Sequence, residues 1–159
     1  MKASVIVLSW NGKPYLEDCL SAVLAQSYPD FEVILVDNAS TDGSADFVAE
    51  RFPGVRIIRN SQNLGFAAGM NVGLKAAEGE ILVLLNQDTV VRENWLTALV
   101  EAMAAEREVG VAGCKILEAD GKTIQHAGAT LEYLSISRHY GYGELDQGQY
   151  DTLRPVDYV

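Results

Sequence analysis

Short runs of apolar residues recur along the first two-thirds of the chain and predict buried β-strands. Each run is shorter than a typical helix, is rich in aliphatic residues and is bounded by polar or turn-forming residues. The runs lie at 4–9, 32–36, 55–58, 80–85 and 109–117. The fourth contains five aliphatic residues in succession, Ile81-Leu82-Val83-Leu84-Leu85, which predicts a buried parallel strand.

The segments between these runs have the spacing of amphipathic helices. They lie at 14–26, 45–52, 66–77 and 93–106. Pro14 suits the first turn of its helix, where its missing N–H costs nothing, and Asp42 or Ser44 is expected to cap the next helix. Gly69 and Gly73 lie inside the third helix, where each costs about 1 kcal/mol relative to alanine. Two such residues indicate close packing against a strand or a ligand.

Strands and helices alternate along this part of the chain, and the connections are too long for hairpins. We therefore predict an α/β fold with a mostly parallel central sheet and helices on both faces. This core is expected to span residues 1–120. The pattern changes after the expected turn at 120–121, so residues 121–159 are predicted to form a less regular extension of strands and loops. The final residues alternate like the start of another strand, and we expect the chain to be cut from a longer protein.

Polar residues follow three of the predicted strands. They form the segments Ser9-Trp10-Asn11, Asp37-Asn38-Ala39-Ser40 and Asn86-Gln87-Asp88. The carboxyl ends of parallel strands meet at one edge of a sheet, and open α/β sheets bind their ligands at that edge. A single polar strand end would mean little, because every strand must end in turn-forming residues. Three such ends in one parallel sheet, two of them with a carboxylate, favour a ligand site.

Composition and charge narrow the classes of partner. The chain has 159 residues, 48% of them apolar, so it can bury a real core; 12 basic and 22 acidic residues give a net charge of −10. Nucleic-acid binding needs a basic surface, so no nucleic acid is expected as partner. A single nucleotide stays compatible, because backbone amides or a metal can hold it. No apolar run approaches the roughly 20 residues of a membrane span, and no secretory signal is present, which predicts a cytoplasmic location.

The cysteines and histidines do not suggest a second site. Cys19 and Cys114 lie in a helix and a strand pattern and are interpreted as small core residues. His126 and His139 are too isolated from them to form a zinc site, and His126 is interpreted as a surface or loop residue. The chain also lacks a P-loop, a dinucleotide-binding fingerprint and a nucleophile elbow.

Four segments carry a resemblance to a known family. They are VIVLSWNG, EVILVDNASTDGS, NLGFAAGMNVGL and GEILVLLNQDT. In this order and spacing they resemble the donor half of family 2 glycosyltransferases over residues 4–117, most closely the rhamnosyltransferase-like branch that builds bacterial surface polysaccharides. The resemblance implies the Rossmann-like GT-A fold. It also implies inverting, metal-assisted transfer from a dTDP-rhamnose-like or UDP-sugar donor to a polysaccharide or lipid-linked acceptor.

The resemblance also implies roles for the polar strand ends. The nucleotide-binding residues would be Ser9, Asn11, Asp37, Asn38, Ser40, Asn63, Gly65, Asn71, Asn86 and Gln87. Within this set, Asp37 or Asn38 would meet the edge of a pyrimidine base, and Asn86 would face the ribose. Gln87 would act as a spacer between Asn86 and Asp88, whose side chains point the same way along an extended segment.

Asp88 is the predicted metal ligand, with Mg²⁺ or Mn²⁺ as the cofactor. A diphosphate leaving group is strongly anionic, and only Lys13, Arg59 and Lys75 are candidate cations near the predicted crevice. A hard cation on Asp88 would neutralise that charge. Asn86 stands where the family places the first carboxylate of its Asp-x-Asp signature, and an amide is the poorer metal ligand.

No general base is identified within the chain, since in this family it comes from the acceptor half and would lie beyond Val159. A non-catalytic nucleotide-sugar-binding domain is therefore the main alternative. A response-regulator-like domain is a weaker one, because the first strand is not followed by an acidic pair, and a purely structural domain is the third. The family resemblance leaves open a peripheral association of the full-length protein with the inner face of the membrane.

Overall fold

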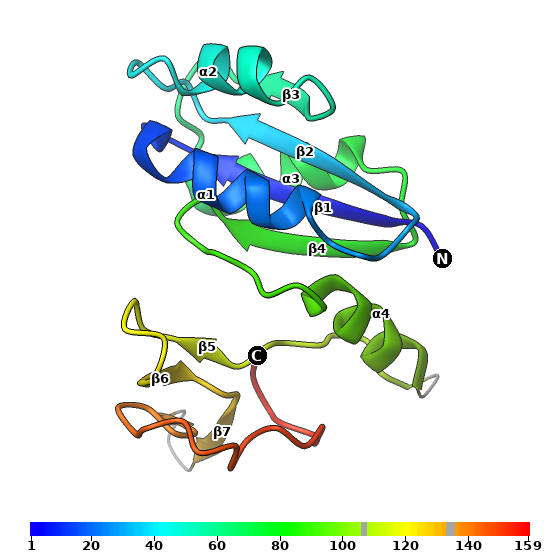
Figure 1. Cartoon of the computed structure of the whole chain (residues 1–159), viewed down its shortest axis with the longest axis vertical. Coiled ribbons are helices and arrows are strands. Elements are labelled where there is room, and N and C mark those ends of the chain that lie inside the picture. Colours follow the sequence, from blue (N-terminus) through cyan, green and yellow to red (C-terminus); the bar gives the residue numbers. More distant parts are fainter. Residues whose placement is uncertain (106–107, 133–135) are drawn as a thin grey trace. The chain divides into compact units, whose positions relative to one another are not determined.

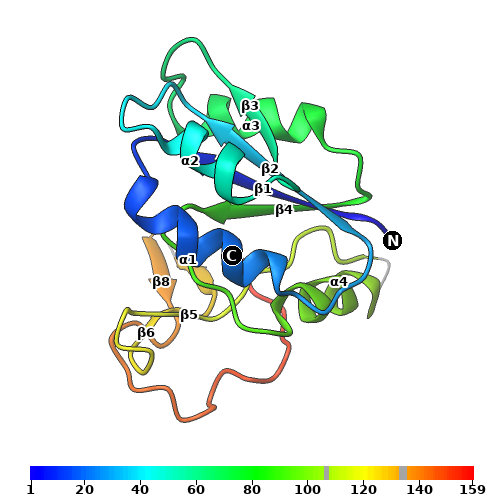
Figure 2. The ribbon, with the colours of Figure 1, turned by 45° about the horizontal axis from the view of Figure 1, so that its top comes forward.

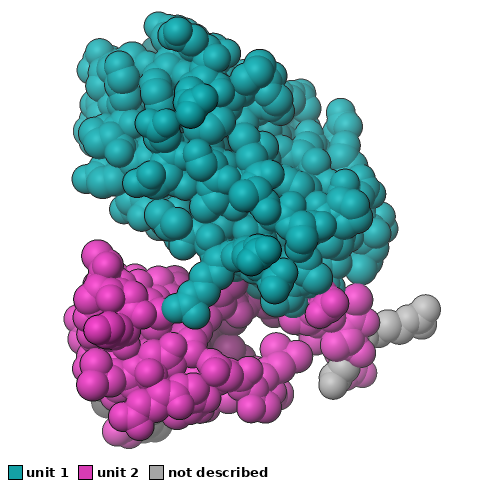
Figure 3. Space-filling model, viewed as in Figure 1, with its two compact units in different colours: residues 1–100 teal, residues 101–159 magenta. Residues whose placement is uncertain are grey.

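The computed structural model describes residues 1–105, 108–132 and 136–159. Internal contacts divide the chain into two compact units, residues 1–100 and residues 101–159, which Figure 3 distinguishes by colour. The domain boundary predicted at residue 120 stays a prediction, because a compact unit is defined by contacts and need not coincide with a domain. No helix in the described ranges is long and apolar enough to cross a membrane.

Unit 1 is built on a four-stranded parallel sheet (Figure 1). Its strands are β1 (Ala3–Ser9), β2 (Phe31–Asp37), β3 (Arg56–Arg59) and β4 (Ile81–Asn86). The order across the sheet is β3-β2-β1-β4, and all three pairings are parallel. The carboxyl ends of β1, β2 and β4 therefore lie at one edge, as the strand pattern predicted.

Helices cover both faces of the sheet (Figures 1 and 2). They are α1 (Lys13–Leu24), α2 (Ser44–Arg51), α3 (Phe66–Ala76) and α4 (Trp95–Ala105). The larger core joins one face of the sheet to α1, α2 and the first residues of α4, and the smaller core joins the other face to α3. The predicted α/β fold with a parallel sheet and helices on both faces is confirmed.

The two glycines of α3 allow this helix to approach the centre of the sheet. A Cβ atom at Gly69 would lie 2.7 Å from Cδ1 of Leu8, and one at Gly73 would lie 2.4 Å from Cγ2 of Ile6. Leu8 and Ile6 belong to β1, the strand between β2 and β4. The glycines therefore mark close helix–strand packing, one of the two alternatives that their positions predicted.

β4 differs from the prediction of a buried strand. Val83 and Leu85 are buried, but Leu82 and Leu84 on the opposite face are 48% and 50% exposed. The reason is position, because β4 is the last strand of the sheet in unit 1 and α3 packs against β1 and β2. An unbroken apolar run does not reveal that only one face of the strand is covered.

Unit 2 contains two small antiparallel sheets. One pairs β5 (Ile116–Leu117) with β6 (Ile124–His126), and the other pairs β7 (Ala129–Glu132) with β8 (Ile136–His139). The strand predicted at 109–117 is wrong for most of its length, since only its last two residues are in a strand and they pair with β6. Two glycines, Gly110 and Gly113, interrupt the run, and glycine weakens a strand interior.

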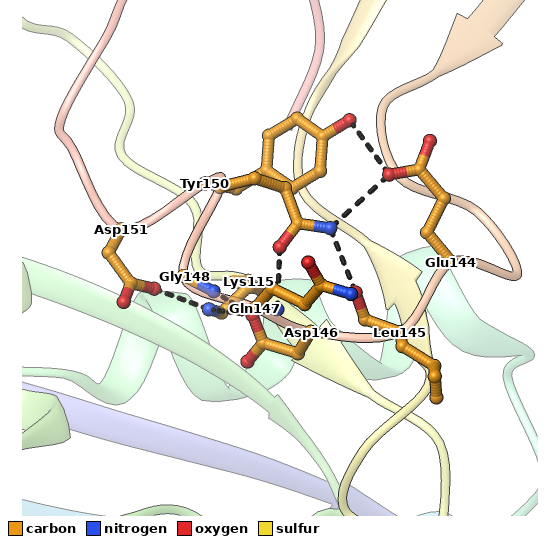
Figure 4. Close-up of polar contacts among 9 residues, drawn as sticks. Lys115, Glu144, Leu145, Asp146, Gln147, Gly148, Tyr150 and Asp151 are labelled. Carbon is orange, nitrogen blue, oxygen red and sulfur yellow. Dashed lines mark hydrogen bonds and ion pairs between the residues drawn. The ribbon is translucent and has the colours of Figure 1, made fainter.

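A lysine fastens the loop after β8 to the segment before β5 (Figure 4). The Nζ group of Lys115 donates to Oδ1 of Asp146 at 2.7 Å and also to Asp151. Burial disfavours the lysine charge, but the hydrogen bonds and charges of the two carboxylates outweigh it and raise the pKa of Lys115. In the same loop, Glu144 accepts hydrogen bonds from Gln149 and Tyr150.

The close approach of α3 can be tested with Gly73→Ala. Alanine would favour the helix by about 1 kcal/mol, but its Cβ would collide with the stiff, β-branched side chain of Ile6. We expect a net loss of about 1–3 kcal/mol in the free energy of unfolding, measured by urea denaturation. Gly54→Ala is the matched control, because nothing lies within 4 Å of a Cβ atom there. Equal stability of the two variants would contradict the packing argument.

Candidate functional site

A cavity of about 340 Å³ opens at the carboxyl edge of the unit 1 sheet. It is lined by Leu8, Trp10, Asn38, Asn63, Gly65, Phe66, Asn86, Gln87 and Asp88. Six of the eleven predicted site residues are in this lining. The other five, which do not line it, are Ser9, Asn11, Asp37, Ser40 and Asn71.

Asn38 uses all four hydrogen-bonding positions of its side-chain amide inside the protein. Its Oδ1 accepts from Nδ2 of Asn60 at 3.1 Å and from the backbone N–H of Leu64 at 3.0 Å. Its Nδ2 donates to Oδ1 of Asn63 at 2.8 Å and to the carbonyl of Gly65 at 3.2 Å. Asn38 is also almost completely buried. In this structure its side chain therefore fixes the 60–65 loop, and direct contact with a base stays a prediction.

Asn63 is held by the same network but keeps a free donor group. Its Oδ1 accepts from Asn38 and from the backbone N–H of Gly65, both at 2.8 Å. No described residue accepts a hydrogen bond from its Nδ2 group, and Asn63 is exposed on the cavity wall. The network thus presents a positioned amide N–H₂ group to the cavity.

The loops that follow β1 and β2 are bound to each other. The backbone N–H of Asn11 donates to Oγ of Ser40 at 2.9 Å, and Oδ1 of Asn11 accepts from the backbone N–H of Thr41 at 2.8 Å. Asn11 and Ala39 have positive φ angles of 50° and 62°, a conformation that alanine rarely adopts. The side chains of Asn11 and Ser40 fasten the two loops, and their predicted contact with a nucleotide is not tested by this geometry.

Asp42 extends the same connection to two helices. Its Oδ2 accepts from the backbone N–H of Lys13 at the start of α1, and its Oδ1 accepts from the backbone N–H of Ser44 at the start of α2. Partial burial opposes the charge of Asp42, but the hydrogen bonds from Ser44 and Lys13 outweigh it and lower the pKa of the carboxyl group. The N-cap residue of α2 is Gly43, so the prediction that Asp42 or Ser44 caps this helix is wrong, although Asp42 accepts from the first backbone N–H of the helix.

Gln87 does more than separate Asn86 from Asp88. Its Oε1 accepts from the backbone N–H of Trp10 at 3.1 Å, and its Nε2 donates to the backbone carbonyl of Trp10 at 3.5 Å. A Cβ atom at Gly12 would lie only 1.9 Å from this Oε1 atom. The end of β4 is thereby fastened to the loop after β1, so interpreting Gln87 as a spacer understated its role.

Two predicted residues are buried at the strand ends. Ser9 is fully buried, and its Oγ is the one buried side-chain polar atom without a partner among the described residues. Asp37 is nearly buried, and its Oδ1 accepts from the backbone N–H of Ser40 at 3.3 Å. Asn71 is exposed on α3, away from the cavity lining. Their contacts with a ligand remain predictions.

Two aromatic residues were not among the predicted site residues. Trp10 and Phe66 line the cavity and are 55% and 61% exposed, which is unusual for large apolar side chains. Trp10 lies between two residues that were selected for their polarity, and Phe66 directly follows Gly65. Each of them is an aromatic residue within a polar strand-end or loop segment, and this pattern could have identified them in the sequence. An aromatic side chain in such a place suits stacking on a flat ligand.

Asp88 is the carboxylate in the cavity lining. It is exposed, and no described residue donates a hydrogen bond to its side chain. At the start of α4 the backbone N–H of Leu96 donates to Oε1 of Gln26 at 3.0 Å, so this N–H has a partner other than Asp88. The oxygen atoms of Asp88 and Asn86 suit a hard cation such as Mg²⁺ or Mn²⁺. No group of three or more acidic, histidine or cysteine side chains suited to a metal occurs among the described residues.

The three cations considered near the crevice do not line the cavity. Arg59 pairs with Asp46 at 2.6 Å, Lys13 lies over the ring of Phe47, and Lys75 is in the last turn of α3. An anionic ligand in this cavity would therefore find Asp88 and amide groups rather than a side-chain cation.

Cys19 lies beneath the end of β4, and its thiol is fully buried. Its thiol donates to the backbone carbonyl of Asn86 at 3.7 Å, and burial raises the pKa of this thiol to about 11. The prediction of a small core residue is confirmed for Cys19, while Cys114 is only partly buried.

Fold and cavity together define an α/β domain with a cavity at the carboxyl edge of a parallel sheet. The sequence model described as Glycosyl transferase family 2 matches residues 4–152, and the chain belongs to this family. The family resemblance noted in the sequence is confirmed. Its solved structural neighbours are GT-A glycosyltransferases, so the GT-A fold is also confirmed.

Two relatives show that this chain corresponds to only part of a longer protein. It is 35% identical over 155 residues to the O-antigen biosynthesis protein RfbC of Myxococcus xanthus, covering 95% of this chain and 12% of that protein. It is 32% identical over 141 residues to the putative teichuronic acid biosynthesis glycosyltransferase TuaG of Bacillus subtilis, covering 82% of this chain and 54% of the relative. The chain therefore spans only part of these proteins.

Two solved structures also resemble this chain over only part of their own length. The mannosyltransferase PcManGT from Pyrobaculum calidifontis, in complex with GDP-Man and Mn²⁺, has a TM-score of 0.68 and 31% identity, covering 74% of this chain and 36% of that one. TarS from S. aureus, in complex with UDP, has a TM-score of 0.63 and 27% identity, covering 75% and 39%. Both are glycosyltransferase folds solved with a nucleotide ligand.

The network around Asn38 can be tested with Asn38→Asp. The change replaces the donating Nδ2 group with an oxygen that would face Oδ1 of Asn63 and the carbonyl of Gly65. We expect faster hydrogen exchange at the backbone amides of Leu64 and Gly65 and a loss of about 1–3 kcal/mol of stability. Asn71→Asp makes the same change at an exposed position and serves as the control. Unchanged protection of both amides in Asn38→Asp would contradict the role assigned to Asn38.

Proposed function

We propose that the cavity in unit 1 binds the nucleoside diphosphate of a donor sugar, UDP- or dTDP-linked, for transfer to a saccharide or lipid-linked acceptor. The observation that carries this proposal is one cavity holding an exposed aromatic face, a positioned amide and an unpaired carboxylate among its described lining residues. These are suited to a base, a ribose and a metal-bound diphosphate respectively. The UDP complex of TarS and the GDP-Man and Mn²⁺ complex of PcManGT support the same ligand class.

Trp10 is the proposed stacking surface for the base. Its side chain is half exposed to the cavity, while Gln87 holds both its backbone N–H and its carbonyl. With its backbone held, a tryptophan has only two side-chain torsions left to fix when a base stacks on its ring, and such stacking contributes about 1–3 kcal/mol. The N–H₂ group of Asn63 would donate to a carbonyl on the edge of the base.

Asp88 is the proposed ligand of Mg²⁺ or Mn²⁺, and Asn86 the proposed partner of the ribose. A bound metal ion would neutralise the diphosphate and stabilise it as the leaving group. Asp88 holds the cation, and Asn86 can donate to or accept from a ribose hydroxyl. The remaining metal ligands would come from the diphosphate and from water, because the described residues supply no further carboxylate to this cavity.

In the proposed transfer, an acceptor hydroxyl attacks the anomeric carbon as the bond to the diphosphate breaks, with inversion. This step needs a base to take the hydroxyl proton. Asp88 is the sole carboxylate in the described cavity lining, and a carboxylate that binds the metal is a poor proton acceptor. This observation favours the second candidate function for the isolated chain, which is nucleotide-sugar binding without transfer.

The metal assignment can be tested by titrating UDP and dTDP with Mn²⁺ and with EDTA. Ligand at 100 times Kd should stabilise the protein by about 2.7 kcal/mol. In Asp88→Asn the extra diphosphate affinity that Mn²⁺ confers should disappear, while uridine affinity stays unchanged. Asp18→Asn, an exposed carboxylate of α1, is the control. A full metal-dependent increment in Asp88→Asn would rule out the metal-ligand role, and no binding of any pyrimidine diphosphate would rule out the site.

The stacking assignment predicts a different pattern for Trp10→Leu. Leucine keeps the position apolar but removes the flat aromatic face. Uridine and UDP should both lose about 1–3 kcal/mol of binding free energy, with or without Mn²⁺. Tyr15→Leu removes an exposed aromatic ring that does not line the cavity and should leave both affinities unchanged. Calorimetry that finds a loss for UDP alone would contradict stacking on the base.

A further inference from the structure

The two histidines of the chain meet in unit 2, although no sequence motif links them. Nδ1 of His126 lies 2.9 Å from Nδ1 of His139, and the rings are edge to face at 5.0 Å between centroids. His126 ends β6 and His139 ends β8, so the contact joins the two small sheets of unit 2. His126 is partly exposed at the end of β6, and its interpretation as a surface or loop residue did not include the contact with His139.

This contact determines how many protons the pair can hold. A neutral pair has two protons, one between the Nδ1 atoms and one on Nε2 of the accepting ring, so the other Nε2 is bare. One further proton fits on that bare Nε2 without breaking the contact. The pair then carries one positive charge and presents an N–H donor on each ring. A fourth proton would place two N–H groups against each other and break the contact.

The pair lines a second hollow, of about 640 Å³, inside unit 2. The lining residues are Gln125, His126, Ser137, Arg138, His139 and Tyr142. Every one of these side chains can donate a hydrogen bond, one carries a fixed positive charge, and none is acidic. In a chain with a net charge of −10, such a lining is the opposite of the average surface.

We propose that this hollow binds an oxyanion, the phosphoryl or carboxylate group of a sugar, and that the histidine pair takes up one proton when it does so. The guanidinium of Arg138 and the two imidazoles would make charge-assisted hydrogen bonds to the oxyanion. Tyr142 is exposed on the same wall and offers its face to the sugar ring. This site goes beyond the donor site proposed above, since no residue of the first cavity takes part.

The surroundings of the pair agree with uptake of a proton on binding. Burial, and next the nearby His139, lower the pKa of His126, which favours the neutral form of this ring before a ligand binds. The ring of Tyr158 lies edge-on to both imidazoles. The carboxylate of Asp157 stays ionised, because hydrogen bonds from Thr130 and Leu131 lower its pKa.

Isothermal titration calorimetry with the full chain tests the proposal. The probes are glucuronate, glucose 1-phosphate and neutral glucose, with glucuronate used for pH dependence because its carboxylate does not titrate above pH 5. We expect glucuronate, glucose 1-phosphate or both to bind and glucose not to bind. Affinity for glucuronate should rise on going from pH 7.5 to pH 6, by up to about tenfold per pH unit for one linked proton. Buffers of different ionisation enthalpy should report uptake of one proton.

Variants and NMR separate this site from the donor site. Replacing both histidines, His126→Gln with His139→Gln, keeps hydrogen-bonding amides but removes both rings that can take the proton, so the pH dependence should vanish. Arg138→Gln should lower affinity at both pH values. Asp88→Asn should bind the sugar anions like the unchanged protein, whatever happens to UDP. Because the chain has two histidines, ¹⁵N spectra follow both rings directly in the unchanged protein.

Each outcome of these experiments either supports or overturns the proposed oxyanion site. Binding of one sugar anion alone supports the proposal and identifies the source of the oxyanion. Equal binding of glucose, independent titration of the two imidazoles at ordinary pKa values, or histidine spectra that neither sugar anion changes would overturn it. Failure of UDP to bind would overturn the donor site alone and would leave this result standing.

Discussion

The buried side chain of Asn38 is the constraint on which the candidate donor site depends. Its amide lies at the end of β2, and every hydrogen-bonding position is matched by a group from the 60–65 loop. A buried amide with an unmet partner would cost about 1–3 kcal/mol, so the strand end and this loop must keep their mutual positions. Because α3 starts where the loop ends, the cavity wall is formed before any ligand arrives, as a precise binding site requires.

A single sequence was enough to predict the fold of unit 1, because its strands and helices differ in local hydrophobic period. It was also enough to predict which edge carries the site, since topology brings the carboxyl ends of parallel strands together. It could not separate side chains that face a ligand from those consumed by internal hydrogen bonds. Asn11, Ser40 and Gln87 have the chemistry of ligand contacts, yet each one fastens a neighbouring loop. That distinction depends on distances between loops, which no local pattern encodes.

The other differences between the predicted and the observed structure also come from contacts between residues distant in the sequence. The run at 81–85 is uniformly apolar, but coverage of Leu82 and Leu84 depends on what lies beside β4 and not on the strand itself. The run at 109–117 has enough apolar residues for a strand, but among the described residues a strand pairing is found only for Ile116 and Leu117. The contact of His126 with His139 joins residues that share no motif, because two separate hairpins bring them together. In each case the structure depended on a contact, or a missing contact, with residues distant in the sequence.

The contact between Gly12 and Gln87 has a consequence for how this family can vary. Position 12 has no room for a side chain while position 87 carries a glutamine directed at the backbone of Trp10. The two positions are therefore expected to drift together over evolutionary time. A lineage that acquires a larger residue at position 12 should also shorten or replace the residue at 87, and its aromatic residue at position 10 would then need another anchor. Correlated substitutions at these positions among homologues would record that history.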